Sequence, residues 1–271
     1  MRNLPVHWSE GLFLRPHHFQ AMERASAERL AITFAAVDPC SYGVVRLELD
    51  AAALANRTVA LRRCQARLRD GTMVWLEQGE EPDRRDLREA CGQLESLTTA
   101  VGDALEVIDT VRVYLAVPRF APTSANVAPP GEPDHSRELV VRQAVQDDTS
   151  GGNDQEVEFR RLNVQLKLST EDLSGFELLP IAQIRRAGNR EAAPELDSTY
   201  FPPMLAVDAW PPLGLNIIRG TYDLVSRKAE LLSEQAVSRQ VGFSSSEPGD
   251  LDRLIMLSKL LEAKAALRVV A

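Results

Sequence analysis

Three of the four histidines of this 271-residue chain lie within its first twenty residues, together with three aromatic side chains. Histidine is the commonest metal ligand and a frequent general base, so His7, His17 and His18 are the first candidates for chemistry. Metal ligands on one helix face recur four residues apart, but adjacent histidines project in different directions, and no HxxxH or HExxH pattern occurs. The spacing disfavours a zinc or iron site and favours a structural or interface role.

No other catalytic pattern accompanies these histidines. The sequence lacks the GxSxG nucleophile motif, the GxxxxGK[ST] phosphate loop and the GxGxxG dinucleotide motif. Its three cysteines, Cys40, Cys64 and Cys91, are odd in number and form no CxxC, which is typical of unpaired thiols in a reducing compartment. We therefore expect a non-enzyme with no catalytic residues, no metal and no cofactor.

Composition favours a protein partner. The formal net charge is −8, which disfavours nucleic acid because phosphate binding requires clustered Lys and Arg. No apolar run approaches the ~20 residues of a membrane-spanning helix, so we expect no membrane insertion. The first residues do not resemble a secretory signal, so we expect a cytoplasmic location.

The elements that position the N-terminal residues begin with a helix. Pro16 suits a first helical turn, and the helix formers after it predict a helix over about residues 17–34. Trp8, Phe13 and Phe19 are then either an anchor buried beneath this helix or an exposed docking arm, because aromatic residues are enriched in interface hot spots. Composition leaves both interpretations open.

From residue 42 the apolar period becomes alternating, which predicts strands. The Asp70-Gly71 pair favours a hairpin turn with positive φ angles. Shifts in the apolar phase predict β-bulges near Arg63 and at Arg160-Arg161. The proline-rich stretch 120–134 is predicted to be a loop, and 137–145 is expected to rejoin the sheet. The alternating segments are 43–50, 56–77, 111–117, 137–145, 156–169 and 176–184.

Because no regular βαβ alternation occurs, these strands predict an antiparallel β-sandwich or a barrel-like sheet. A domain boundary is expected in the stretch that begins at Asp197, where two Pro-Pro pairs flank a short apolar link. Helical periodicity over 215–236, with a cap at Gly242, and again over 251–267 predicts two long helices. Their apolar stripes are too wide for two helices to bury, so further helices from this chain or its copies are expected. The expected oligomerisation residues are Leu215, Ile218, Tyr222, Val225 and Leu232.

Several short motifs occur in an order that resembles one known family. The segment WSEGLFLRPHHFQ is similar to W-x-E-G-M-x-L-x-P-Q-H-F-Q, the N-terminal pattern of the TssK family of type VI secretion baseplate subunits. Leu12 replaces its Met and His17 its Gln. Tyr42-Gly43 resembles a Trp-Gly pair of the family, Asp70-Gly71-Thr72 a Pro-Asp-Gly-Thr turn, and LDSTYFPP (196–203) an L-D-x-x-Y-x-P-P element.

This resemblance implies an α+β protein, in which an antiparallel β-sandwich similar to the shoulder of phage receptor-binding proteins precedes a helical neck bundle. We accordingly expect a docking segment over 1–18, the shoulder over 19–195 and an incomplete neck over 205–271. Members of the family form homotrimers that join the wedge proteins TssF and TssG to the TssJLM membrane complex at the inner face of the inner membrane. Family members continue into a C-terminal head, which we expect to be absent here, and its absence would put the TssJLM contact in doubt.

The docking segment is the expected contact with TssF and TssG. An alternative function is a receptor- or carbohydrate-binding β-sandwich module, for which exposed loop aromatics would be typical, but the stretch 121–154 contains no Phe, Trp or Tyr. The expected partner-binding residues are Trp8, Glu10, Gly11, Phe13, Leu14, Arg15, Pro16, His18, Phe19 and Gln20.

Overall fold

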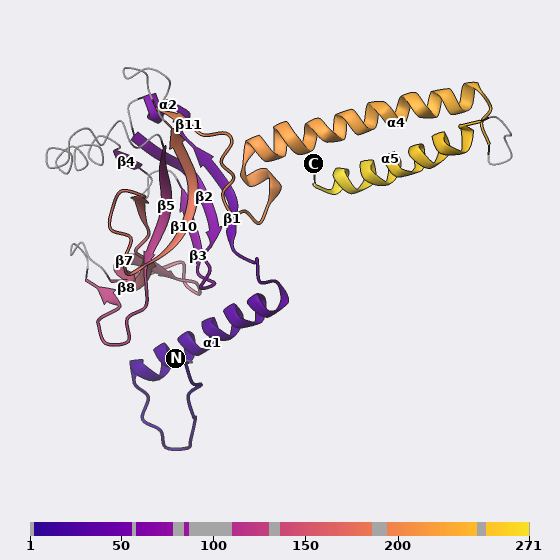
Figure 1. The fold of residues 1–271 in the computed structure, drawn as a ribbon. Coiled ribbons are helices and arrows are strands. Elements are labelled where there is room, and N and C mark those ends of the chain that lie inside the picture. The colour runs from indigo at the N-terminus through magenta and orange to yellow at the C-terminus, as the bar shows by residue number, and fades with distance from the viewer. Residues whose placement is uncertain are drawn as a thin grey trace. The chain divides into compact units, whose positions relative to one another are not determined.

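Figure 1 shows the fold in a computed structural model that describes residues 3–55, 58–77, 84–86, 110–129, 136–185, 194–242 and 248–270. The chain divides into two compact units, Met1–Leu205 and Ala206–Ala271. The first unit contains the helices α1 and α2 and all the strands among the described residues, and the second contains two long helices, α4 and α5.

Helix α1 spans Pro16–Val37 and confirms the helix predicted over 17–34. Arg15 precedes it in an extended conformation, and Pro16 occupies the first turn, where a missing N–H costs no hydrogen bond. The helix ends where the Asp38 N–H donates to the Phe34 carbonyl, at 2.9 Å. The structure describes all 22 residues of α1, and only Ala25 is buried. The sheets therefore cover very little of this helix.

The first sheet has the strand order β1-β2-β3, with β4 also pairing β2. In the β1–β2 ladder, Glu48 lies opposite Arg63 but Leu49 lies opposite Leu61, so Arg62 is an extra residue. This confirms the predicted bulge near Arg63, beyond which the buried positions change phase. The elements are β1 (Gly43–Leu49), the short helix α2 (Ala51–Ala55), β2 (Thr58–Arg67), β3 (Met73–Glu77) and β4 (Arg84–Asp86).

Gly43 and Gly71, which lie in the motifs that resemble those of the TssK family, each let a neighbouring segment approach the backbone closely. The β2–β3 hairpin turns at Asp70-Gly71 as predicted, although of the two residues only Gly71 has a positive φ, +89°. A Cβ on Gly71 would lie 2.7 Å from the Ala31 Cβ of α1, and one on Gly43 (φ +141°) would lie 2.7 Å from the Met204 nitrogen. A side chain at either position would force the neighbouring segment away.

The second sheet is antiparallel, has the order β11-β10-β5-β9 and supplies much of the buried core. Its long strands β5 and β10 confirm the strands predicted at 111–117 and 176–184. The elements are β5 (Thr110–Pro118), β9 (Gln165–Leu168), β10 (Phe176–Arg185) and β11 (Glu195–Leu196). Fully or almost fully buried side chains include Val113, Leu115, Val117, Leu166, Leu168, Leu179 and Ile181.

A third sheet corrects two predictions. Strands β7 (Glu138–Asp147) and β8 (Gly152–Leu162) form a long antiparallel hairpin, and β6 (Val127–Ala128), within the predicted loop, pairs with β7 in parallel. Segment 137–145 therefore joins this third sheet and not the main one. The predicted bulge at Arg160-Arg161 is also wrong, because the β7–β8 register runs through both residues without a shift.

The apolar phase changes after β8 because the chain changes sheets. Residues 163–164 separate β8 from β9, which pairs with β5 in the second sheet. Asn163 is buried at this crossing, and its side-chain amide donates to the Ser136 carbonyl at 2.9 Å. A β-bulge and a change of sheet both shift the phase of the alternating apolar residues, so the sequence pattern does not distinguish them.

The second unit is helical. It contains the 3₁₀ turn η2 (Val207–Ala209), the π-helix η3 (Pro212–Arg219), α4 (Gly220–Ser238) and α5 (Asp250–Val270). The two predicted helices are present, but the predicted cap at Gly242 is wrong, because α4 ends at Ser238 and Gln240 takes the positive φ, +51°. Glu230 of α4 and Lys264 of α5 form an ion pair at 3.5 Å. None of the described helices is both long and apolar enough to cross a membrane.

Together the two units make a mixed helix and sheet fold whose sheets are predominantly antiparallel.

Candidate functional site

The N-terminal segment, residues 3–20, keeps its large apolar side chains at the surface. Trp8 is 48% exposed, Phe13 77% and Phe19 47%. Exposing several large apolar side chains within one short segment costs hydrophobic free energy unless a partner covers them. The chain does not bury them beneath its own helix, and this favours the docking-arm interpretation over the buried anchor.

Hydrogen bonds and ring contacts shape the start of α1. The backbone N–H of Arg15 donates to Nδ1 of His18 at 3.1 Å, and the His18 N–H donates to the Arg15 carbonyl at 3.0 Å. Since Nδ1 accepts a hydrogen bond, it carries no proton in this arrangement. The Trp8 ring lies 6.2 Å from the His18 ring and 6.5 Å from the Phe19 ring, between centroids. His18 thus caps the helix and supports Trp8.

The other expected partner-binding residues of the segment are exposed. Glu10 and Gly11 lie in the turn before the helix, where Gly11 has a φ of +80°. The Arg15 guanidinium lies 6.0 Å from the centroid of the exposed Phe13 ring. His7 and His17 are exposed, and within the described ranges no three His, Cys, Asp or Glu side chains are grouped as a metal site requires.

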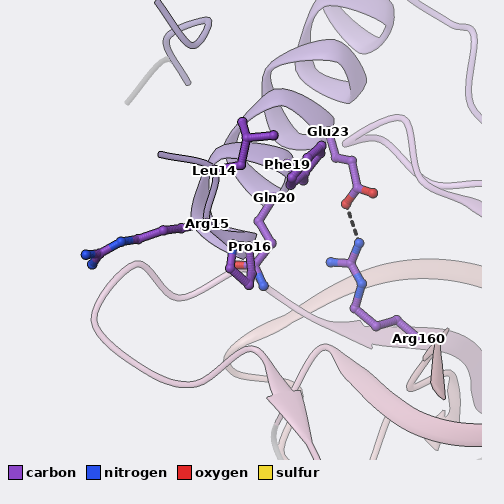
Figure 2. A pocket seen from close by; sticks show the side chains of 7 residues that line it. All are labelled: Leu14, Arg15, Pro16, Phe19, Gln20, Glu23 and Arg160. Carbon is purple, nitrogen blue, oxygen red and sulfur yellow. Dashed lines mark hydrogen bonds and ion pairs between the residues drawn. The ribbon is translucent and has the colours of Figure 1, made fainter. Parts of the chain in front are cut away.

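An open groove of about 410 Å³ lies beside the first turns of α1 (Figure 2). Its walls come from the N-terminal segment, from α1 and from one arginine of β8. Five expected partner-binding residues line it. The lining residues are Leu14, Arg15, Pro16, Phe19, Gln20, Glu23 and Arg160. Sequence reasoning missed Glu23 and Arg160, because their proximity depends on a contact between segments more than a hundred residues apart.

Arg160 connects the hairpin to α1 at this groove. Its guanidinium forms ion pairs with Glu23 of α1 and, at 3.2 Å, with Glu138 of β7 (Figure 2 draws the first). Burial alone would lower the pKa of Arg160, but the hydrogen bond that it donates to Glu23 and the charges of the Glu23 and Glu138 carboxylates outweigh burial, so the pKa is raised. The guanidinium therefore stays charged and joins the apolar groove to the β7–β8 hairpin.

The expected oligomerisation residues differ in exposure. Leu215 is exposed, Ile218, Tyr222 and Val225 are half-buried, and Leu232 is buried inside the chain itself. Leu232 therefore offers little surface to a partner. Other apolar side chains of η3 and α4 are exposed instead, namely Ile217, Leu224, Leu231 and Val237.

Of the cysteines, Cys40 is exposed and Cys64 is buried, and neither forms a disulfide. Burial raises the pKa of the Cys64 thiol to about 12, so this thiol stays protonated near neutral pH and is a poor nucleophile. Cys91 lies outside the described residues.

The chain is similar to bacterial type VI secretion proteins in sequence and in fold. Residues 18–271 match the family model described as "Bacterial Type VI secretion, VC_A0110, EvfL, ImpJ, VasE". The chain is 26% identical over 245 residues to the type VI secretion system baseplate component TssK1 of Pseudomonas aeruginosa. That alignment covers 90% of this chain but 51% of TssK1, so the chain spans about half the length of this curated relative.

Solved structures show the same fold. A crystal structure of TssK is similar over 98% of this chain and 56% of its own, with a TM-score of 0.77 and 21% identity. A chain from the cryo-electron microscopy structure of a TssK-TssF-TssG baseplate subcomplex is similar over 98% of this chain and 80% of its own, with a TM-score of 0.74 and 21% identity. A chain of a type VI baseplate complex is similar over 100% of this chain and 57% of its own, with a TM-score of 0.77 and 22% identity.

Proposed function

Because the chain belongs to the TssK family of bacterial type VI secretion proteins, described by the names EvfL, ImpJ and VasE, we propose that it is a structural, non-enzymatic component of the secretion baseplate. The observation that carries this proposal is the family match over residues 18–271. The relationship to TssK1, itself a baseplate component, supports it.

In this proposal the chain is an adaptor between the TssF–TssG wedge and the membrane complex, in the cytoplasm at the inner membrane. Residues 1–18 are the docking segment, 19–195 the β-sandwich shoulder and 205–271 a helical neck. TssF and TssG are proposed as partners because one of the similar chains comes from a TssK-TssF-TssG subcomplex.

The docking role rests on the exposed N-terminal surface. The groove presents Leu14, Pro16 and Phe19 beside the charged groups of Glu23 and Arg160. An apolar centre flanked by charges is the usual composition of a protein interface, in which the apolar contacts give affinity and the charges restrict orientation.

A homotrimer through the neck is proposed from the exposed apolar side chains of the second unit. Leu215 and Leu224 are well exposed, and Ile255 and Leu261 are exposed on α5. Two paired helices cannot cover these side chains, and burial in a bundle formed by three copies would contribute about 25 cal/mol per Å² of apolar surface. Leu215, Ile218, Tyr222 and Val225 are the proposed contact residues, with Leu232 supporting them from inside the chain.

Co-purification of this chain with TssF and TssG tests the docking role. Trp8→Ala and Phe13→Ala each remove an exposed aromatic side chain, so we expect unchanged thermal unfolding and an affinity reduced on the order of tenfold or more, as at interface hot spots. Trp75→Ala is the matched control, since Trp75 is an exposed tryptophan on β3 outside the segment. The docking role is wrong if both N-terminal variants fold and still bind TssF and TssG as the native chain does.

A further inference from the structure

The β7–β8 hairpin has an open edge. Within the described parts of the chain, β8 pairs with β7 alone and lies at the end of its sheet. Every residue from Asn153 to Arg161 is exposed. β6 pairs only with Glu138 and Leu139, so the rest of the hairpin is a two-stranded ribbon. Such a ribbon is only marginally stable in water, and its row of unpaired backbone groups is a template for another strand. This edge can therefore accept a further strand.

Two hydrogen bonds identify which residues of β8 face outward. The Glu138 N–H donates away from β8, to the Asn126 carbonyl beside β6, whereas the Asn163 N–H donates to the Arg137 carbonyl across the β7–β8 ladder. Because hydrogen-bonding direction alternates along a strand, the odd-numbered residues of β8 bond to β7. The backbone groups of Glu156, Glu158 and Arg160 therefore point to the open edge.

The two faces of the hairpin differ in chemistry. Directly opposite residues share a face, so Val141 and Phe159 lie together, as do Gln143 and Val157. This face carries exposed apolar side chains, with Phe159 at 42%. The opposite face is charged. There Arg142 pairs with Glu158 at 3.0 Å, and Arg160 pairs with Glu138.

The charges along the outward positions of β8 favour one antiparallel register with a second copy of β8. A register centred on Glu158 places the Glu158 residues of the two copies opposite each other. One centred on Arg160 does the same for the two Arg160 residues. Directly opposed like charges destabilise a sheet, so both registers are unfavourable. A register centred on Val157 places Glu156 opposite Glu158. A register centred on Phe159 places Glu158 of each copy opposite Arg160 of the other, twice by symmetry.

We propose that β8 is a self-complementary interface that pairs with β8 of a second copy of this chain, antiparallel and centred on Phe159. The two hairpins then form a four-stranded sheet. On its apolar face, Val141 and Phe159 of both copies form one continuous row across the strands. On its charged face, Glu158 lies between Arg142 of its own chain and Arg160 of the other. This two-fold contact is distinct from the proposed trimer, and it shares Arg160 with the groove beside α1.

Disulfide trapping tests the register on the whole chain, with Cys40 and Cys91 replaced by serine and the buried Cys64 kept. At the centre of the register the two residues 159 form a non-hydrogen-bonded pair with Cα atoms about 4.5 Å apart, close enough for a disulfide. The two residues 157 lie four positions apart, about 14 Å, which is too far. We expect Phe159→Cys to form a covalent dimer under mild oxidation and Val157→Cys to remain uncrosslinked. No dimer from folded Phe159→Cys, or equal dimer from both variants, would overturn the proposal.

Charge reversal tests the same contact without cysteines. Sedimentation experiments measure the association step in which the β8 contact joins two copies and doubles the mass. Glu158→Arg should weaken this mass-doubling step on the order of tenfold, because the introduced guanidinium would oppose Arg160 of the second copy. Glu156→Arg is the matched control, since Glu156 faces Leu162 in this register, and it should leave that step within about twofold of the native chain.

The double variant R142E/E158R separates this effect from the intrachain ion pair. It restores an ion pair between positions 142 and 158 but keeps a positive charge at position 158 opposite Arg160, so the weakening should persist. Recovery of native self-association in this double variant, or a native mass-doubling step in Glu158→Arg, would contradict the proposed register. Binding of TssF and TssG, scored in parallel, reports on the proposed function and not on this contact.

Discussion

Strands β5 and β8 belong to the same unit and both alternate apolar with polar residues, yet their surroundings are opposite. β5 lies between β9 and β10, and its residues Val113, Leu115 and Val117 are fully buried. β8 is an edge strand whose residues Val157 and Phe159 are exposed. Alternation therefore predicts that a segment is a strand, whereas burial depends on how many elements from elsewhere in the chain pack against it.

Helix α1 resembles β8 in this respect, because only Ala25 of its 22 residues is buried. A helix with one buried residue gains little hydrophobic free energy from its own chain. We infer that the buried sheets carry the stability of the first unit, while α1 and the β7–β8 hairpin are available to other molecules.

A matched pair of valines should show the largest difference between the two strands. Val113→Ala leaves a cavity in the core, so we expect the free energy of unfolding to fall by about 2 kcal/mol. Val157→Ala removes the same atoms from a surface position and should change it by less than about 0.5 kcal/mol. Urea unfolding of both variants measures the difference. Similar losses from the two would show that the hairpin shares the core's stability.

A matched pair of arginines should show a smaller difference. The largely buried Arg137 donates to the Asp70 carboxylate at 2.8 Å, to the Thr72 hydroxyl at 2.6 Å and to the Pro118 carbonyl at 2.9 Å. Arg137→Ala leaves these acceptors without their donor, and we expect a loss of about 1.5 kcal/mol. Arg142→Ala removes one exposed ion pair and should cost less than about 0.5 kcal/mol.

Chemical denaturation of the two arginine variants, measured side by side, tests this expectation. An equal cost at positions 137 and 142 would mean that the bonds between the β2–β3 turn and the start of β7 add nothing to stability.

The smallest effect concerns the response to acid. The Thr199 hydroxyl at 2.6 Å and the Thr199 N–H at 2.9 Å hold the pKa of Asp197 below its usual 3.8, although burial opposes this. A depressed folded pKa contributes stability above the unfolded pKa and loses it as the pH falls through the folded value. The stability difference between the native chain and Asp197→Asn should therefore be constant above about pH 5 and shrink as the pH falls below about 4.

The exposed Asp147 at the hairpin tip provides the control for this pH series. Its pKa is also lowered, chiefly by the Thr149 N–H, but solvent screens its charge, so Asp147→Asn should change the acid response less. Unfolding measured from about pH 3 to pH 7 compares the two variants. A pH-independent difference for Asp197→Asn would show that these hydrogen bonds do not stabilise the charged form.

Local signals in the sequence determined much of this protein. The helix after Pro16, the turn at Gly71, the bulge beside Arg63 and the two C-terminal helices each depend on neighbouring residues, through proline geometry, positive φ or apolar period. The ordered motifs also resemble those of the TssK family. Such features are predictable because the forces that select them act within a few residues.

Only the tertiary structure decided which elements meet. The phase change after Arg160-Arg161 proved to be a passage between two sheets, and Glu23 joined Arg160 across the groove. Trp8 and Phe13 could have been core or surface, and they are surface. These outcomes depend on contacts between residues far apart in the chain, and the energy of such contacts depends on the partners that the fold brings together, which no local pattern specifies.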